Sequence, residues 1–96
     1  MNENLKTIIL NFFKKHDLET NDLHFYSAEE WKNRGEIYGK GAELNVTFDG
    51  NILYHIVNHT NGKWSFKMDD LFTKELEKAG VYYELGYTWC LGLYKI

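Results

Sequence analysis

The sequence predicts an α+β fold, in which an antiparallel sheet of four or five strands carries two main helices and one short helix, mainly on one face. Three features predict it. Residues 4–17 have the apolar spacing of a helix, two turn dipeptides divide residues 41–68 into alternating segments, and residues 81–96 alternate throughout. A chain of 96 residues has room for one core, so residues 1–96 are expected to form a single domain.

The first predicted helix covers residues 4–17. Its apolar residues recur at the spacing i, i+3, i+4, i+7 and i+8, which places them on one helix face. They are Leu5, Ile8, Ile9, Phe12 and Phe13. Lys14, Lys15 and His16 follow in the last turn, where positive charge complements the helix dipole. This helix is therefore expected to face the core.

A local motif predicts the short helix, over residues 28–34. Ser27 and Glu30 have the spacing of a capping box, in which each side chain accepts a hydrogen bond from the other residue's backbone N–H. Tyr26 and Trp31 occupy the flanking positions of a hydrophobic staple. The capping role accounts for Glu30 better than a role as a catalytic acid or base.

Residues 41–68 predict a three-stranded antiparallel meander. The dipeptides Asp49-Gly50 and Asn61-Gly62 favour two-residue hairpin turns, and counting outward from them gathers the large apolar residues on one face. That face holds Leu44, Val46, Phe48, Leu53, Val57, Trp64, Phe66 and Met68, together with His55 and His59. The opposite face is polar apart from a row on the middle strand, formed by Ile52, Tyr54 and Ile56.

A third helix is predicted over residues 69–79. Asp69 or Asp70 would cap it, and Gly80 would end it. Its apolar stripe consists of Leu71, Phe72, Leu76 and Ala79.

The tail, residues 81–96, has apolar residues at odd positions from Val81 to Leu93. Period two over this length predicts strand structure. Either one long strand or a hairpin bent near Gly86 or Gly92 satisfies the pattern.

The composition weakens several classes of function. The formal net charge is −3 and Arg34 is the single arginine, which argues against a surface built to bind nucleic-acid phosphates. No apolar run is long enough to span a membrane. Cys90 is the single cysteine and the N-terminal residues lack the features of a signal peptide, so a cytoplasmic location is expected.

No arrangement of residues predicts a catalytic or metal site. His55 and His59 have a spacing that binds zinc on a helix, but on a strand they would stand about 13 Å apart. Cys90 has no neighbouring histidine to act as a base. We therefore expect neither a metal nor a cofactor, and the sequence favours a protein that is not an enzyme.

The exposed row of Ile52, Tyr54 and Ile56 predicts a protein-binding surface, because aromatic and large apolar residues anchor interfaces. The function expected first is therefore a small interaction domain, such as an inhibitor, an immunity-type protein or an accessory protein. Its partner would be another protein. A homodimer is also expected to be accessible through an open edge strand, either residues 42–48 or part of the tail. A second layer covering the row is the competing interpretation.

Two other functions compete with this one. A small-molecule-binding protein or small enzyme would use a pocket between helix and sheet, lined by His55, His59 and Trp64. A single-stranded nucleic-acid binder would stack bases on Tyr54 and the tail tyrosines. The acidic composition and the missing basic RNP pattern weigh against that third function.

Overall fold

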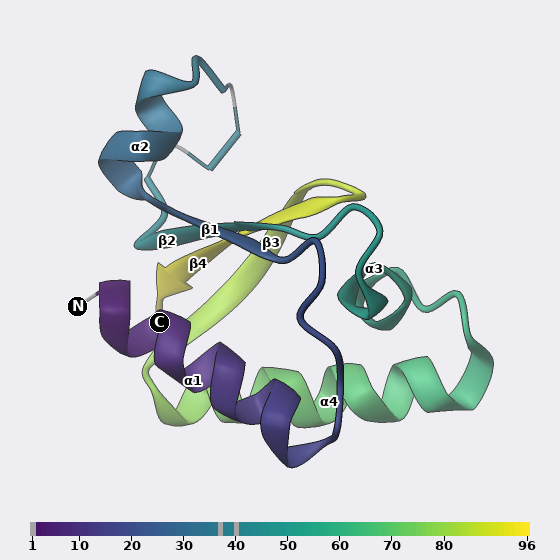
Figure 1. Ribbon diagram of the computed structural model, residues 1–96. Helices are drawn as coiled ribbons and strands as arrows, with labels where there is room; N and C mark the ends of the chain where they lie inside the picture. The colour runs from purple at the N-terminus through teal and green to yellow at the C-terminus, as the bar shows by residue number, and fades with distance from the viewer. Residues whose placement is uncertain (1, 37, 40) are drawn as a thin grey trace.

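The computed structural model describes residues 2–36, 38–39 and 41–96. Within these residues four helices and four strands follow one another along the chain (Figure 1). They are α1 (Asn2–Lys15), β1 (His24–Ser27), α2 (Ala28–Asn33), β2 (Leu44–Thr47), α3 (Ile52–Val57), α4 (Gly62–Lys78), β3 (Val81–Tyr87) and β4 (Cys90–Lys95).

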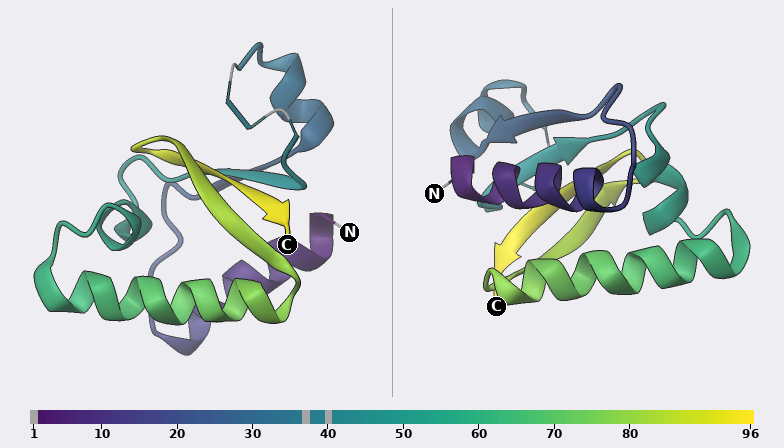
Figure 2. Two further views of the ribbon diagram at one scale, coloured as in Figure 1. Left: turned by 180° about the vertical axis from the view of Figure 1, so that it is seen from behind. Right: turned by 60° about the horizontal axis from the view of Figure 1, so that its bottom comes forward.

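The strands form one antiparallel sheet in the order β1-β2-β4-β3. Helices α1 and α4 lie side by side under one face of this sheet, and α2 lies at one end beyond the opposite face (Figures 1 and 2). This arrangement confirms the predicted α+β class and a four-stranded antiparallel sheet with the main helices on one face.

The core lies between the sheet and helices α1 and α4. Leu44 and Val46 of β2 are buried in it, as are Leu91 and Leu93 of β4. From the helices, the rings of Phe12 and Phe72 meet with their centroids 5.3 Å apart. The predicted N-terminal helix is confirmed, and its buried residues are Leu5, Ile9, Phe12 and Phe13.

The predicted meander is wrong. Asp49-Gly50 does form a turn, but the chain then enters helix α3, because the Asn51 side chain accepts a hydrogen bond from Leu53 N at 2.9 Å and caps that helix. Asn61-Gly62 leads into α4 instead of a hairpin. Strand β2 consequently pairs with β1 and β4, where Val46 lies opposite Phe25 and Leu91.

The predicted third helix is present but begins seven residues earlier, at Gly62, so neither Asp69 nor Asp70 caps it. Its buried side chains recur at helical spacing from the start, at Ser65, Met68, Phe72 and Leu76. The helix does end before Gly80, which has the left-handed φ of 80°. Because α4 begins at Gly62, Trp64 and Phe66 belong to this helix and not to a strand of the sheet.

The tail is a hairpin, one of the two alternatives that the sequence left open. Strands β3 and β4 are joined by a turn at Thr88 and Trp89, and their register shifts between Leu85 and Tyr87. Strand β4 lies inside the sheet and β3 at its edge.

The capping box of α2 is confirmed in full. Ser27 Oγ accepts from Glu30 N at 3.1 Å, and Glu30 Oε1 accepts from Ser27 N at 2.8 Å. The rings of Tyr26 and Trp31 pack with centroids 5.4 Å apart. Trp31 is 1% exposed and its indole donates to the Tyr38 carbonyl, so Trp31, Tyr38 and Gly39 cover part of the outer sheet face.

Candidate functional site

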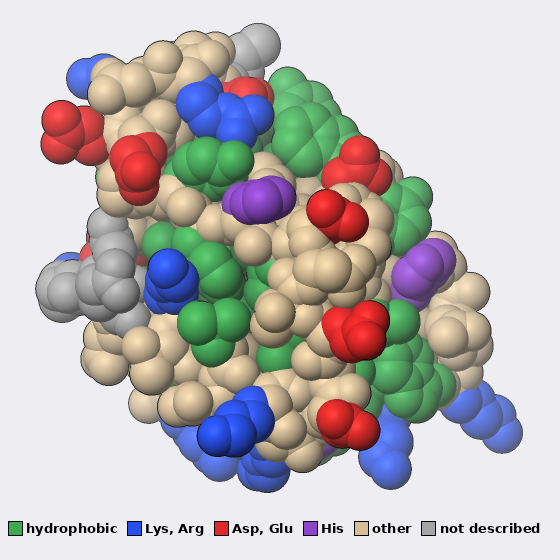
Figure 3. Space-filling view, viewed as in Figure 1, with side chains coloured by type: hydrophobic (Ala, Val, Ile, Leu, Met, Phe, Trp, Pro, Cys, Tyr) green, Lys and Arg blue, Asp and Glu red, His purple; other side chains and the backbone are tan. Residues whose placement is uncertain are grey.

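A groove of about 630 Å³ lies between the linker after α1, the turn after β2, helix α3 and the first turn of α4. The residues lining it are Asp17, Leu18, Glu19, Asn21, Asp49, Gly50, Asn51, Ile52, Tyr54, His55 and Trp64. We call it the acidic groove. On the face shown in Figure 3, acidic side chains follow one another down the right half, beside hydrophobic side chains.

Asn51 holds the two walls of the acidic groove together. Its side-chain amide donates to the carbonyl of Glu19 at 2.9 Å and to the carbonyl of Asn21 at 2.7 Å. In return, Asn21 Nδ2 donates to the Gly50 carbonyl at 3.4 Å. Because Asn51 is only 2% exposed and also caps α3, these bonds fix the linker 17–21 against the start of α3.

One side of the groove is aromatic. Trp64, in the first turn of α4, is 37% exposed, and Tyr54 on α3 is half-buried against the core. His55 packs edge-on against Tyr54, with ring centroids 5.5 Å apart. Its Nδ1 lies 2.5 Å from Thr60 Oγ1, which orients the imidazole. The groove therefore offers π-faces next to polar atoms.

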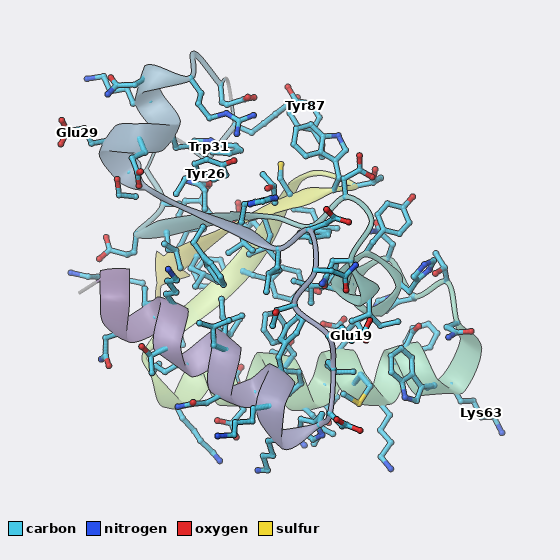
Figure 4. The ribbon with its side chains drawn as sticks, viewed as in Figure 1. Glu19, Tyr26, Glu29, Trp31, Lys63 and Tyr87 are labelled. Atoms are coloured by element: carbon cyan, nitrogen blue, oxygen red, sulfur yellow. The ribbon has the colours of Figure 1, made fainter. Side chains whose placement is uncertain are left out.

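The other side is negatively charged. Asp17, Glu19 and Asp49 are exposed, and their carboxylates form no ion pair or side-chain hydrogen bond with the rest of the described chain. None of the residues that line the groove is Lys or Arg. Figure 4 labels Glu19 on the linker between α1 and β1. The groove thus presents unneutralised negative charge next to aromatic rings.

The predicted interaction row does not form, because its residues lie on a helix. On α3, Ile52 and Ile56 are one turn apart while Tyr54 points elsewhere. Ile56 is fully buried. Ile52 and Tyr54 are half-buried against the core and line the acidic groove. Two of the three residues therefore lie on a wall of the acidic groove and not on a sheet face.

The predicted ligand-pocket residues are also divided. His55 and Trp64 line the acidic groove. His59 does not: it follows α3 with a left-handed φ of 55°, and its Nε2 lies 2.6 Å from Asp69 Oδ2. Phe66 stacks on its ring with centroids 4.3 Å apart. The expected pocket between helix and sheet is thus replaced by a groove between two helices and a linker.

Asp69 joins His59 to a second partner. The hydroxyl of Tyr83 donates to Asp69 Oδ1 at 2.8 Å. Burial raises the pKa of Tyr83 well above its usual value, and the hydrogen bond to Asp69 raises it further. The three side chains tie the α3–α4 connection to α4 and β3, outside the acidic groove.

Cys90 lies on the outer face of the sheet under α2. It is buried, and its Sγ accepts a hydrogen bond from Tyr87 N at 3.3 Å. Burial raises the pKa of its thiol. The cavity beside it, which Trp31 and Asn45 also line, measures about 50 Å³ and is too small for more than a water or two. Cys90 therefore acts as a packing residue here.

The acidic residues of the groove were missed at the level of sequence. Asp17 and Glu19, which line the groove, and Asp22, which does not, stand within six positions of one another between the first helix and the first strand. Asp49 joins them only because Asn51 ties its turn to the linker. The local density of acids was the available signal, but its meeting with Trp64 depends on the tertiary fold.

Comparisons with known protein families, with curated proteins and with solved structures find no match for this chain. Across the described residues, no group of three or more His, Cys, Asp or Glu side chains is placed to hold a metal ion. None of the described helices has the length and hydropathy needed to cross a membrane.

Proposed function

We propose that the protein is a non-enzymatic interaction domain whose acidic groove binds a basic segment of a partner protein. The observation that carries the proposal is the pairing of three unneutralised carboxylates with the exposed ring of Trp64 and the half-buried ring of Tyr54 in one groove. Lysine and arginine side chains match both features, since carboxylates attract the charge and the face of a tryptophan or tyrosine attracts cations.

The chemistry of the lining residues favours an arginine in particular. A planar guanidinium can stack on Trp64 and donate two hydrogen bonds to a carboxylate of Asp17 or Glu19. Because the carboxylates are exposed, each ion pair contributes only about 0.2–1 kcal/mol. Binding should therefore be moderate and should weaken as salt is added. An inhibitor, an immunity-type protein or an accessory protein would work in this way.

One further observation bears on the class of partner, and another bears on the location of the protein. The negative charge of the groove repels phosphates, which weighs against single-stranded nucleic acid as the partner. Cys90 is buried and unpaired, which agrees with a reducing, cytoplasmic location.

The test is a titration of ¹⁵N-labelled protein with a hexa-arginine peptide, followed by NMR. We expect shifts of the Glu19 and Asn51 amides and of the Trp64 indole, with a neutral Gly-Ser peptide producing none. The double variant D17N/E19Q should weaken binding several-fold. The matched variant E29Q/E77Q changes the net charge equally at exposed sites outside the groove and should bind like the wild type. Equal weakening by both variants would contradict the proposal.

A small cationic molecule is the second candidate. The groove volume of about 630 Å³ lies within the roughly 300–1,000 Å³ usual for ligand pockets, and His55 and Trp64 line it. Spermine and arginine methyl ester are suitable probes. If either binds the groove as tightly as the hexa-arginine peptide, the small-molecule function is favoured over the protein-binding one.

A further inference from the structure

Strand β3 leaves one of its edges unpaired. It is the last strand in the sheet order, and the left view of Figure 2 shows no described helix or strand lying across it. The predicted edge at residues 42–48 is wrong, because β2 has β1 on one side and β4 on the other. The two edge strands are β1, which has four residues, and β3 in the tail, which has seven. The longer open edge therefore lies in the tail, and none of its residues lines the acidic groove.

The hydrogen bonding of the hairpin shows which backbone groups face outward. Ile96 N donates to the Gly80 carbonyl at 3.0 Å, so Gly80 points toward β4. Antiparallel strands alternate between bonded and non-bonded pairs, so every second residue along β3 does the same. The N–H and C=O groups that face the open edge are those of Val81, Tyr83 and Leu85.

This edge lacks the usual features that prevent strands from pairing. Residues 81–87 contain neither proline nor lysine, and Glu84 is their single charge. The strand pairs regularly with β4 from Val81 to Leu85, and the register shifts only after that. Five residues of regular strand are thus open to another strand.

The core-facing side chains of β3 include one that is left exposed. Val81 and Tyr83 belong to or pack against the core, and alternation places Leu85 on the same face. Leu85 is nevertheless 40% exposed, because nothing described lies beyond it. On the other face, Tyr82 is 38% exposed next to the exposed Glu84.

We propose that a second copy of this chain pairs with β3 in antiparallel orientation, with the two-fold axis at Tyr83. In this register Tyr83 lies opposite Tyr83 of the second copy, and Val81 lies opposite Leu85. All three are the residues whose backbone groups face outward, so about six backbone hydrogen bonds form across the interface. The two sheets become one continuous sheet, and each exposed Leu85 gains an apolar neighbour.

The two neighbouring registers are less favourable. An axis at Glu84 would place two carboxylates directly opposite each other, which is destabilising. An axis at Tyr82 would pair Glu84 with Gly80 and leave Leu85 beyond the paired region. With the axis at Tyr83, Tyr82 faces Glu84 of the second copy, and its hydroxyl can donate to that carboxylate. The side-chain chemistry therefore selects one register.

The first experiment measures the molar mass of the full chain by light scattering after size-exclusion chromatography, over a range of concentrations. We expect a dimer that dissociates on dilution. Leu85→Lys should raise the dissociation constant about tenfold or more, since it places a charge against Val81 of the second copy. Phe66→Lys replaces a more exposed apolar residue that belongs to α4 and not to the edge strand, and it should leave the dimer intact. Thermal melting verifies that both variants fold.

A disulfide experiment tests the register in a Cys90→Ala background. In this register the Cα atoms of Tyr82 in one copy and Glu84 in the other would lie about 4.5 Å apart, which is within disulfide range. The Cα atoms of the two Tyr82 residues, one from each copy, would be roughly 7–8 Å apart. A mixture of the Tyr82→Cys and Glu84→Cys proteins should therefore cross-link on mild oxidation, and either protein alone should not. A monomer at several hundred micromolar, a dimer unaffected by Leu85→Lys, or cross-linking of either variant alone would each overturn the proposal.

Discussion

The Tyr83 hydroxyl donates a 2.8 Å hydrogen bond to Oδ1 of Asp69, and this bond joins the edge strand β3 to helix α4. The other oxygen of the same carboxylate lies 2.6 Å from His59 Nε2, in the connection between α3 and α4. With 15% of its side chain exposed, Asp69 is shielded enough for these contacts to matter. One carboxylate therefore links three parts of the chain.

Replacing Tyr83 with phenylalanine tests this link. The variant keeps the ring that packs near Phe72 but removes the donor to a charged acceptor. We expect the free energy of unfolding to fall by about 1–2 kcal/mol, the usual range for such a bond in a half-buried place. Urea unfolding measures it. Tyr38→Phe, at an exposed position outside the sheet, should change the free energy little, and equal losses would show that the bond to Asp69 is not the cause.

The same tyrosine predicts how stability depends on alkaline pH. Burial first, and then the hydrogen bond to Asp69, raise the pKa of Tyr83 above its unfolded value of 10.0. A pKa raised by folding gives a stabilising contribution that is complete below about pH 10 and is lost as the pH rises toward the folded value. We expect the wild type to lose stability above pH 10 faster than Tyr83→Phe does. Unfolding free energies of both proteins between pH 8 and 11 measure this, and parallel curves would contradict it.

Cys90 should be inert in the native protein. Its thiol is buried, and burial raises its pKa, so little thiolate is present and reagents cannot reach it. We expect labelling by an aromatic disulfide reagent at pH 8 to be slow and to become fast in denaturing urea. Fast labelling of the folded protein would mean that the outer sheet face opens readily beside α2.

Helix α3, which follows β2, could not be predicted because its apolar residues also fit a strand. Residues i and i+4 share a face in a helix and also in a strand, so Leu53 and Val57 fit both structures. Ile56, three residues after Leu53, fits only the helix, but the turn signal of Asp49-Gly50 outweighed it. The structure uses that turn and lets Asn51 cap a helix straight afterwards.

The start of α4 could not be predicted from the sequence for a related reason. Trp64, Phe66 and Met68 alternate as a buried strand would, yet Trp64 and Phe66 are exposed. The buried position between them is Ser65, whose hydroxyl donates to the His55 carbonyl at 2.7 Å and accepts from Asn61 N at 2.9 Å. A small polar residue that is buried through its hydrogen bonds cannot be recognised from hydrophobic spacing.

The parts of the fold that could be predicted are those with a local cause. The capping box at Ser27 acts within four residues, and the spacing of residues 4–17 and 81–96 depends on the period of the backbone alone. The acidic groove has no such local cause. Two of its aromatic and imidazole residues, His55 and Trp64, were expected in a pocket, but they meet Glu19 only because of contacts across about thirty residues of chain.

Asn51 makes those contacts, and replacing it separates two of its roles. Asn51→Ser keeps an oxygen that can cap α3 but cannot reach the carbonyls of Glu19 and Asn21. Asn51→Ala loses the cap as well. We expect Asn51→Ser to lower the free energy of unfolding by about 1–3 kcal/mol, through the loss of two hydrogen bonds in a buried place. Asn51→Ala should lose about 1 kcal/mol more, which is the usual value of a helix cap.

The consequence for the groove distinguishes this bridge from an ordinary stabilising contact. When the linker 17–21 is no longer held against α3, its backbone amides should exchange with solvent faster, while those of the sheet keep their protection. Binding of the hexa-arginine peptide should weaken in Asn51→Ser although every charge in the groove remains. Asn33→Ala, at an exposed position on α2, serves as the control and should change neither property. A destabilised Asn51→Ser that binds the peptide like the wild type would show that the groove does not depend on the bridge.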